Sequence, residues 1–251
     1  MLASRTAVSA LTLVAGLAAW SYSAPSQAYP LNPWGVQTAQ GSYVLNPFLY
    51  FYNKGKGVYP IVYGATGLGE RMDVIAGVGG WTWLSGGLDG GLDGLEVMPR
   101  YFFNESMGVT VHLIYGLPGS STYVENQLTV APEFHGVFGG DSLALTVNAG
   151  WRPTLGGGAG FQPGAVVAYL APEYNFSSQF SLFLEIDPSF TLGEGGGLGM
   201  LLVPGVGFAL DPDQTHTFSV GVQVDPLSDS GGDFLENNVS LGVWYATAFG
   251  G

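Results

Sequence analysis

Residues 215–225, THTFSVGVQVD, alternate between apolar and polar or small side chains along their whole length. One face of this stretch carries His216, Phe218, Val220, Val222 and Val224. The other face carries threonine, serine, glycine, glutamine and aspartate. A period of two over this length is typical of a β-strand with one apolar face. The stretch therefore predicts a strand, and the same pattern recurs in residues 180–191 and 238–249.

The alternation continues through most of the chain after residue 40, with turn residues between the alternating stretches. It predicts about twelve strands, near residues 41–52, 58–66, 70–83, 94–104, 107–116, 124–136, 141–152, 161–175, 179–191, 199–211, 215–225 and 238–249. The pattern is weakest in residues 58–66, and counts from about ten to fourteen also fit. An even number would place both chain ends on the same side of a membrane barrel.

The composition favours a strand protein whose outer surface faces lipid. Apolar residues make up 47% of the chain and charged residues only 10%, whereas about 25% is usual for charged residues in soluble domains. No stretch beyond the N-terminal segment is long and apolar enough for a membrane helix. Only helices and closed barrels can satisfy every backbone polar group in a bilayer. We therefore expect an all-β, antiparallel transmembrane β-barrel, with a secreted β-sandwich as the alternative.

The predicted connections alternate in length along the chain. Short turns are expected near residues 104–106, 139–142, 175–179 and 211–215. Longer loops, rich in glycine or aspartate, are expected near residues 84–94, 117–123, 154–160, 192–198 and 226–237. Short turns at one end and longer loops at the other are typical of bacterial outer-membrane barrels.

A proline recurs at one point of the predicted hairpin unit. The repeated segments are Leu-Asn-Pro-Phe at 45–48, Val-Met-Pro-Arg at 97–100, Val-Ala-Pro-Glu at 130–133, Leu-Ala-Pro-Glu at 170–173 and Leu-Val-Pro-Gly at 202–205. By alternation each of these prolines lies on the apolar face. Since proline cannot donate to the ladder, we expect a bulge or local kink at these positions.

The N-terminal residues 1–28 have the layout of a secretory signal peptide. Arg5 precedes an apolar run that ends near Trp20, and small residues precede a cleavage site after Ala28. The mature protein is then one domain, residues 29–251, in the bacterial outer membrane. Residues 240–249 look like the C-terminal signal read by the outer-membrane assembly machinery. The chain has no cysteine, which excludes a disulfide framework.

Several charged residues fall on the face opposite the apolar one, where they would point into the barrel. We expect the lumen constriction to include Arg100, His112, Glu133, His135, Glu173 and Glu185, with Glu96, Arg152 and Asp187 also inward. Charged side chains inside a pore select solutes. The alternative is a set of paired charges that fills a narrow barrel and stiffens its wall. No catalytic residue, metal ligand or cofactor is predicted, and the net charge of −13 argues against nucleic acid as a partner.

The aromatic side chains leave two interpretations open. Those considered are Tyr43, Tyr50, Tyr52, Tyr59, Trp81, Trp83, Tyr101, Phe103, Tyr174, Phe176, Tyr245 and Phe249. They could form the two girdles that flank the apolar belt of a membrane barrel. The sequence does not separate girdle residues from residues that face the lumen.

Several short motifs resemble those of a known barrel family. They are Gly69-Glu-Arg-Met-Asp-Val, Pro99-Arg-Tyr-Phe-Phe, Leu113-Ile-Tyr-Gly-Leu-Pro-Gly119, Ala131-Pro-Glu, Val147-Asn-Ala-Gly-Trp151 and Gly221-Val-Gln-Val-Asp-Pro-Leu227. From about residue 70 to 249 the chain resembles the outer-membrane barrel family linked to the meta-pathway of phenol degradation. The resemblance implies a channel for small, often aromatic or apolar, compounds.

We therefore expect an outer-membrane channel or transporter for small solutes, without enzyme activity. Its expected partners are outer-membrane lipid, the assembly machinery and a small-molecule solute. One alternative is a non-conducting structural or adhesion barrel whose exterior loops bind partners. Another is an outer-membrane lipid hydrolase, which would need a histidine close to a serine.

Overall fold

The computed structural model describes residues 37–52, 57–83, 89–104, 106–119, 125–156, 160–193, 196–211, 216–227 and 239–250. Its strands are β1 (Ser42–Tyr52), β2 (Gly57–Gly69), β3 (Met72–Trp83), β4 (Asp89–Asn104), β5 (Met107–Gly116), β6 (Gln127–Gly139), β7 (Leu143–Gly156), β8 (Phe161–Ser177), β9 (Phe180–Thr191), β10 (Leu198–Ala209), β11 (His216–Val224) and β12 (Val239–Gly250). The predicted signal peptide lies outside the described residues and stays a prediction.

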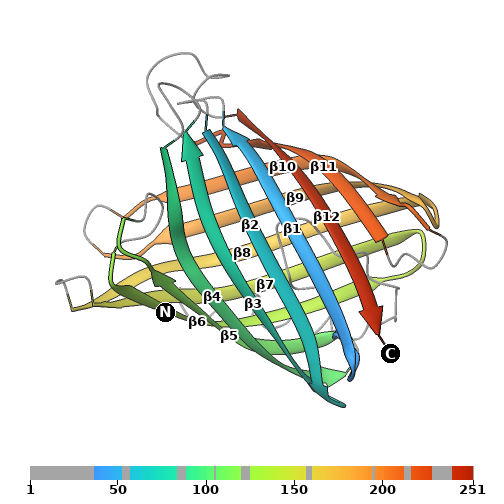
Figure 1. The fold of residues 1–251 in the computed structure, drawn as a ribbon, viewed down its shortest axis with the longest axis horizontal. Helices are drawn as coiled ribbons and strands as arrows, with labels where there is room; N and C mark the ends of the chain where they lie inside the picture. Colours follow the sequence, from blue (N-terminus) through green and yellow to red (C-terminus); the bar gives the residue numbers. More distant parts are fainter. Residues whose placement is uncertain are drawn as a thin grey trace, which may run out of the picture.

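The twelve strands form one closed antiparallel barrel. Each strand pairs with its neighbours in the chain, and β1 pairs with β12 to close the ring, as Figure 1 shows. The strand with the weakest sequence pattern, β2, pairs along its length with both β1 and β3. The twelve strands in one closed ring confirm the predicted fold class and strand count. Because the ring is closed, the sheet has no unpaired edge. Among the described residues, no helix has the length and apolar character needed to cross a membrane.

The two faces of the strands are those that the alternation predicts. On β9, Leu182 and Leu184 are 42% and 38% exposed on the outside of the barrel. Ser181, which precedes them, and Glu185, which follows them, are fully buried on the inside. An exposed apolar outer face and a polar inner face are the inverse of a soluble sandwich. The barrel alternative is therefore correct and the sandwich alternative is wrong.

The two ends of the barrel differ. The turn end carries the start of β1, the end of β12 and the connections after β2, β4, β6, β8 and β10. The loop end carries the other strand ends, among them the end of β5 and the start of β6. Two predicted loops were too long, because β4 already begins at Asp89 and β7 continues to Gly156. Ladder pairing with β3 holds residues 89–94 in the strand despite their three glycines.

The repeated prolines interrupt the ladder without shifting its register. Pro99 pairs with Val74 on β3, but the ladder between β4 and β5 has a gap at Pro99 and resumes at Arg100 in the same register. Pro47, Pro132, Pro172 and Pro204 likewise keep their pairing on one side and lie at a gap on the other. At Pro99 the Thr110 hydroxyl donates to the proline carbonyl, at 2.8 Å. The structure has no bulge at these prolines, because the register is the same on both sides of each gap, and the alternative of a local kink stays a prediction.

Aromatic side chains outside the barrel gather near both ends. At the turn end the rings of Tyr43 and Phe249 stack, and a second group contains Tyr174, Phe176, Phe180 and Phe208. Near the loop end, Trp151 contacts Phe161 across β7 and β8. Such belts are typical of membrane barrels, where aromatic rings lie at the level of the lipid headgroups.

Candidate functional site in the barrel lumen

The inner face of β2 to β7 carries a connected series of polar side chains. The Tyr63 hydroxyl of β2 donates to Glu96 Oε2 of β4, at 2.8 Å. The same oxygen lies 2.9 Å from Nε2 of His112 on β5. Nδ1 of His112 faces Glu133 of β6, with 3.8 Å between nitrogen and carboxylate oxygen. The Tyr63–Glu96 hydrogen bond therefore links two strands, β2 and β4, that are not neighbours in the sheet.

Glu133 has partners on β7 as well. Asn148 donates to its Oε2 at 2.9 Å, and Nε of Arg152 lies 3.0 Å from its Oε1. The Arg152 side chain is 37% exposed, whereas the Glu133 side chain is fully buried. Arg152 thus presents a cation to the open part of the lumen while it neutralises a buried carboxylate. We call the set Tyr63, Glu96, His112, Glu133, Asn148 and Arg152 the polar network.

Arg100 is held in a separate ion pair. Its guanidinium binds both carboxylate oxygens of Asp73 on β3, at 2.7 Å and 2.5 Å, and both side chains are almost completely buried. Its Cζ atom lies 5.0 Å from the centre of the Phe102 ring. A two-point arginine–carboxylate pair is geometrically specific and strong. Arg100 therefore lies in the lumen as predicted, but its charge is neutralised by Asp73.

The chain before β1 enters the barrel at the turn end and covers this pair. The Thr38 backbone N–H donates to Asp73 Oδ2 at 2.7 Å, and Gln37 Nε2 donates to the Gly69 carbonyl at 3.0 Å. Gln40 forms a parallel bridge with Gly67. A Cβ atom at Gly67 would lie 2.2 Å from the Ala39 carbonyl oxygen, so only glycine lets the segment lie this close.

The remaining predicted residues occupy different parts of the lumen. His135 of β6 packs edge-on against Phe102, with ring centres 5.0 Å apart. Glu173 of β8 and Glu185 of β9 are both buried, on the side of the barrel away from Arg100. The Tyr169 hydroxyl donates to Glu185 at 3.2 Å. All six predicted residues thus face inward, but they form three separate groups and not a single ring.

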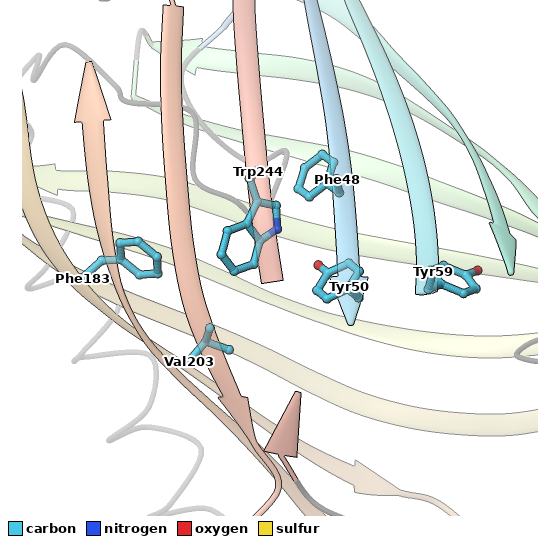
Figure 2. Packing of buried hydrophobic residues seen from close by; sticks show 6 residues of the cluster. All are labelled: Phe48, Tyr50, Tyr59, Phe183, Val203 and Trp244. Atoms are coloured by element: carbon cyan, nitrogen blue, oxygen red, sulfur yellow. The ribbon is translucent and has the colours of Figure 1, made fainter. Parts of the chain in front are cut away.

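An apolar surface adjoins the polar network at Tyr63 and continues round the barrel through β1, β12 and β10 to β9. It consists of Phe48, Tyr50, Tyr59, Phe183, Val203 and Trp244, with Ile61, Tyr63 and Leu201 packed against it. Figure 2 shows the first six of these side chains, which come from β1, β2, β9, β10 and β12. The rings of Tyr50 and Trp244 meet edge to face, with centres 6.0 Å apart. We call this set the apolar wall.

Glycines make room for the inward rings. A Cβ atom at Gly205 would lie 2.2 Å from the Phe183 ring, and one at Gly221 would lie 2.9 Å from the Trp244 ring. Each ring therefore lies flat over the neighbouring strand and does not project across the lumen. The same arrangement places Tyr63 over Gly77. Aromatic rings that cover strand glycines in this way stabilise a curved sheet.

Several lumen residues were missed in the sequence. Asp73 and Asp93 lie inward, the latter accepting a hydrogen bond from the Tyr59 hydroxyl at 2.6 Å. Tyr50 and Tyr59 line the lumen and are not girdle residues. Phe183 and Trp244 were also missed, although both lie on the polar face by alternation. The alternation could have placed Phe183 inside, because it is two residues from both Ser181 and Glu185 and so shares their face of the strand.

Comparison with solved structures gives several membrane barrels of similar architecture. The NanC porin aligns with a TM-score of 0.57 at 7% identity, over 81% of this chain and 98% of that one. An outer membrane channel from Pseudomonas putida F1 aligns with a TM-score of 0.56 at 13% identity, over 89% and 100%. The KdgM porin aligns with a TM-score of 0.53 at 12% identity, over 82% and 99%. The likeness shows the fold.

No protein-family model matches the chain. A search of curated proteins also gives no match. The resemblance to the meta-pathway family is therefore neither confirmed nor contradicted and stays a prediction.

Proposed function

We propose that the chain is a passive channel of the bacterial outer membrane for small solutes with apolar or aromatic groups. One observation carries the proposal: within one closed barrel, the polar network and the apolar wall line different arcs of the inner face and meet at Tyr63. A solute with an apolar body and a polar group can contact both surfaces. Binding sites for such molecules combine apolar lining with a few polar groups that fix orientation.

The charge of the lumen bears on the kind of solute. The inward carboxylates are Asp73, Asp93, Glu96, Glu133, Glu173, Glu185 and Asp187. Arg100 and Arg152 are the arginines that face them within the described strands. The KdgM neighbour has been solved with oligogalacturonate, an acidic sugar chain. A lumen with this excess of carboxylates disfavours anions, so we propose neutral or cationic solutes for this chain.

The decisive experiment is single-channel conductance of the refolded mature protein, residues 29–251, in a planar bilayer. Arg152→Ala is the most informative variant, because this side chain is partly exposed in the lumen. We expect discrete current steps whose cation preference rises when its positive charge is removed. Arg71→Ala is the control, since Arg71 is exposed in the turn between β2 and β3.

Uptake of uncharged solutes completes the test. Proteoliposomes should swell faster in arbutin, an uncharged phenyl glucoside, than in sucrose, because only arbutin offers a ring to the apolar wall. Equal rates for the two solutes would reject the aromatic preference. Folded, inserted protein without current or swelling would reject the channel itself.

A non-conducting structural barrel is the second candidate, and close packing near the turn end favours it. Asp73, Met98, Phe102 and Arg100 are all almost completely buried inside the barrel. Side chains that are this tightly packed fill the interior and stabilise the wall. The conductance measurement decides between the two candidates, because a filled lumen carries no current.

A further inference from the structure

Two carboxyl groups on β9 are only partly satisfied. Glu185 and Asp187 lie two residues apart on the inner face of the strand, and their carboxyl groups face each other within hydrogen-bonding range. The Tyr169 hydroxyl donates to Oε2 of Glu185 at 3.2 Å. Within the described residues, Oε1 of Glu185 and Oδ1 of Asp187 have no hydrogen-bond partner. A buried carboxylate oxygen without a partner is costly, so these atoms favour the arrival of a cation or a donor.

The nearby arginine does not meet this need. Arg152 of β7 lies within electrostatic range of Asp187. Its Nε, however, donates to Glu133 at 3.0 Å, and that carboxylate is fully buried. The guanidinium is therefore engaged on the β6 side of the lumen. Among the described residues, neither carboxyl group of β9 is therefore in an ion pair.

Apolar side chains border the two carboxyl groups directly. Across the ladder, Val203 of β10 is the register partner of Glu185, and Leu201 is the partner of Asp187. Phe183 precedes Glu185 on the same face of β9. Val203 and Phe183 belong to the apolar wall, and Leu201 packs against it. The surface thus changes from carboxylate to apolar within a single side-chain spacing.

This juxtaposition fits a particular class of ligand. An organic ammonium ion can place its charge against carboxylates and its hydrocarbon body against apolar and aromatic side chains. Two carboxylates provide too few oxygens for Ca²⁺, which takes about six to eight ligands. An anion of the same shape would meet repulsion from both carboxyl groups.

We propose that Glu185 and Asp187 form a subsite for the ammonium group of small aromatic or alkyl amines, whose apolar part lies on Phe183 and Leu201. The inference rests on the proposed function and names the solute class of that channel. Asp187 is partly exposed and lies nearer the loop end than Glu185, which is fully buried.

The test uses two probes of matched shape and opposite charge, benzylammonium and benzoate. Reversal potentials across planar bilayers give their permeability ratio for the mature protein. We expect wild type to prefer benzylammonium at least about fivefold, the factor given by about 1 kcal/mol for one ion pair at 4 Å in water. The Glu185→Gln/Asp187→Asn double variant should lose most of this preference. Glu70→Gln, an exposed carboxylate in a turn, should leave it unchanged.

Each outcome has a defined meaning. A wild-type permeability ratio near one would overturn the subsite and leave the channel intact. A ratio that is unchanged in the double variant would do the same, and it is the result expected if the two carboxyl groups only share a proton. A silent but folded protein would instead reject the channel. Calorimetric titration of benzylammonium into the detergent-solubilised protein then decides the subsite: binding that requires both carboxylates supports it. If the double variant does not fold, Asp187→Asn alone is the test.

Discussion

Replacing Arg100 with alanine should destabilise the barrel strongly, because it leaves Asp73 buried without its counter-ion. In the structure both side chains are almost completely buried, and the guanidinium binds both carboxylate oxygens. Removing one partner of such a pair costs about 3–5 kcal/mol. The backbone N–H of Thr38 still donates to Asp73 after the change, but one neutral donor does not compensate a full charge.

The assay is reversible urea unfolding in lipid vesicles, followed by tryptophan fluorescence. Arg71→Ala is the matched control, since it removes an exposed arginine and should change the free energy of unfolding by no more than about 0.5 kcal/mol. The Asp73→Asn/Arg100→Met double variant removes both charges and keeps an oxygen for the Thr38 N–H. It should recover at least half of the loss. Equal stability of Arg100→Ala and Arg71→Ala would refute the buried ion pair as a stabilising contact.

Two further predictions concern the two faces of the wall. Gly205→Ala should lower the free energy of unfolding in urea by about 1–3 kcal/mol, because its Cβ would lie 2.2 Å from the Phe183 ring. Gly69→Ala is the control, since its Cβ meets open space and the change should be close to neutral. Equal effects of the two variants would argue against the ring contact. On the outer face, Leu184→Arg should lower the free energy of unfolding by about 2–4 kcal/mol, and Leu198→Arg, at the loop end, by about 0–1 kcal/mol. The two values differ because the penalty for a charged side chain falls from the middle of the membrane towards its surface. The reverse order would contradict the membrane placement.

The strands could be predicted from the sequence because lipid outside and side chains inside impose opposite preferences on alternate residues. Residues 179–191 were expected as a strand, and β9 occupies Phe180–Thr191. Inward orientation followed from the same parity for Arg100 and Glu133. Local alternation is the only information this step needs.

The pairing of the inward charges could not be predicted in the same way. Arg100 could have reached Glu133, since both residues pair with Thr110 of β5. It binds Asp73 instead, its register partner on β3. The carboxylate that an arginine binds depends on the register of the ladder and on the direction of the side chain. The alternation within a single strand predicts neither of these. The parity therefore predicts which charged residues face inward but not which of them pair.

Some of the glycines lie in strands, where they leave space for aromatic rings inside the barrel. Turns and loops account for part of the 41 glycines, but Gly77, Gly205 and Gly221 lie in strands and face inward beneath aromatic rings. A ring that projected straight into a barrel of twelve strands would obstruct it, since the interior of such a barrel is narrow. A neighbouring glycine lets the ring lie flat along the wall. The glycines thus allow the apolar wall to be both aromatic and thin, and the proposed passage of a small apolar solute beside it depends on this.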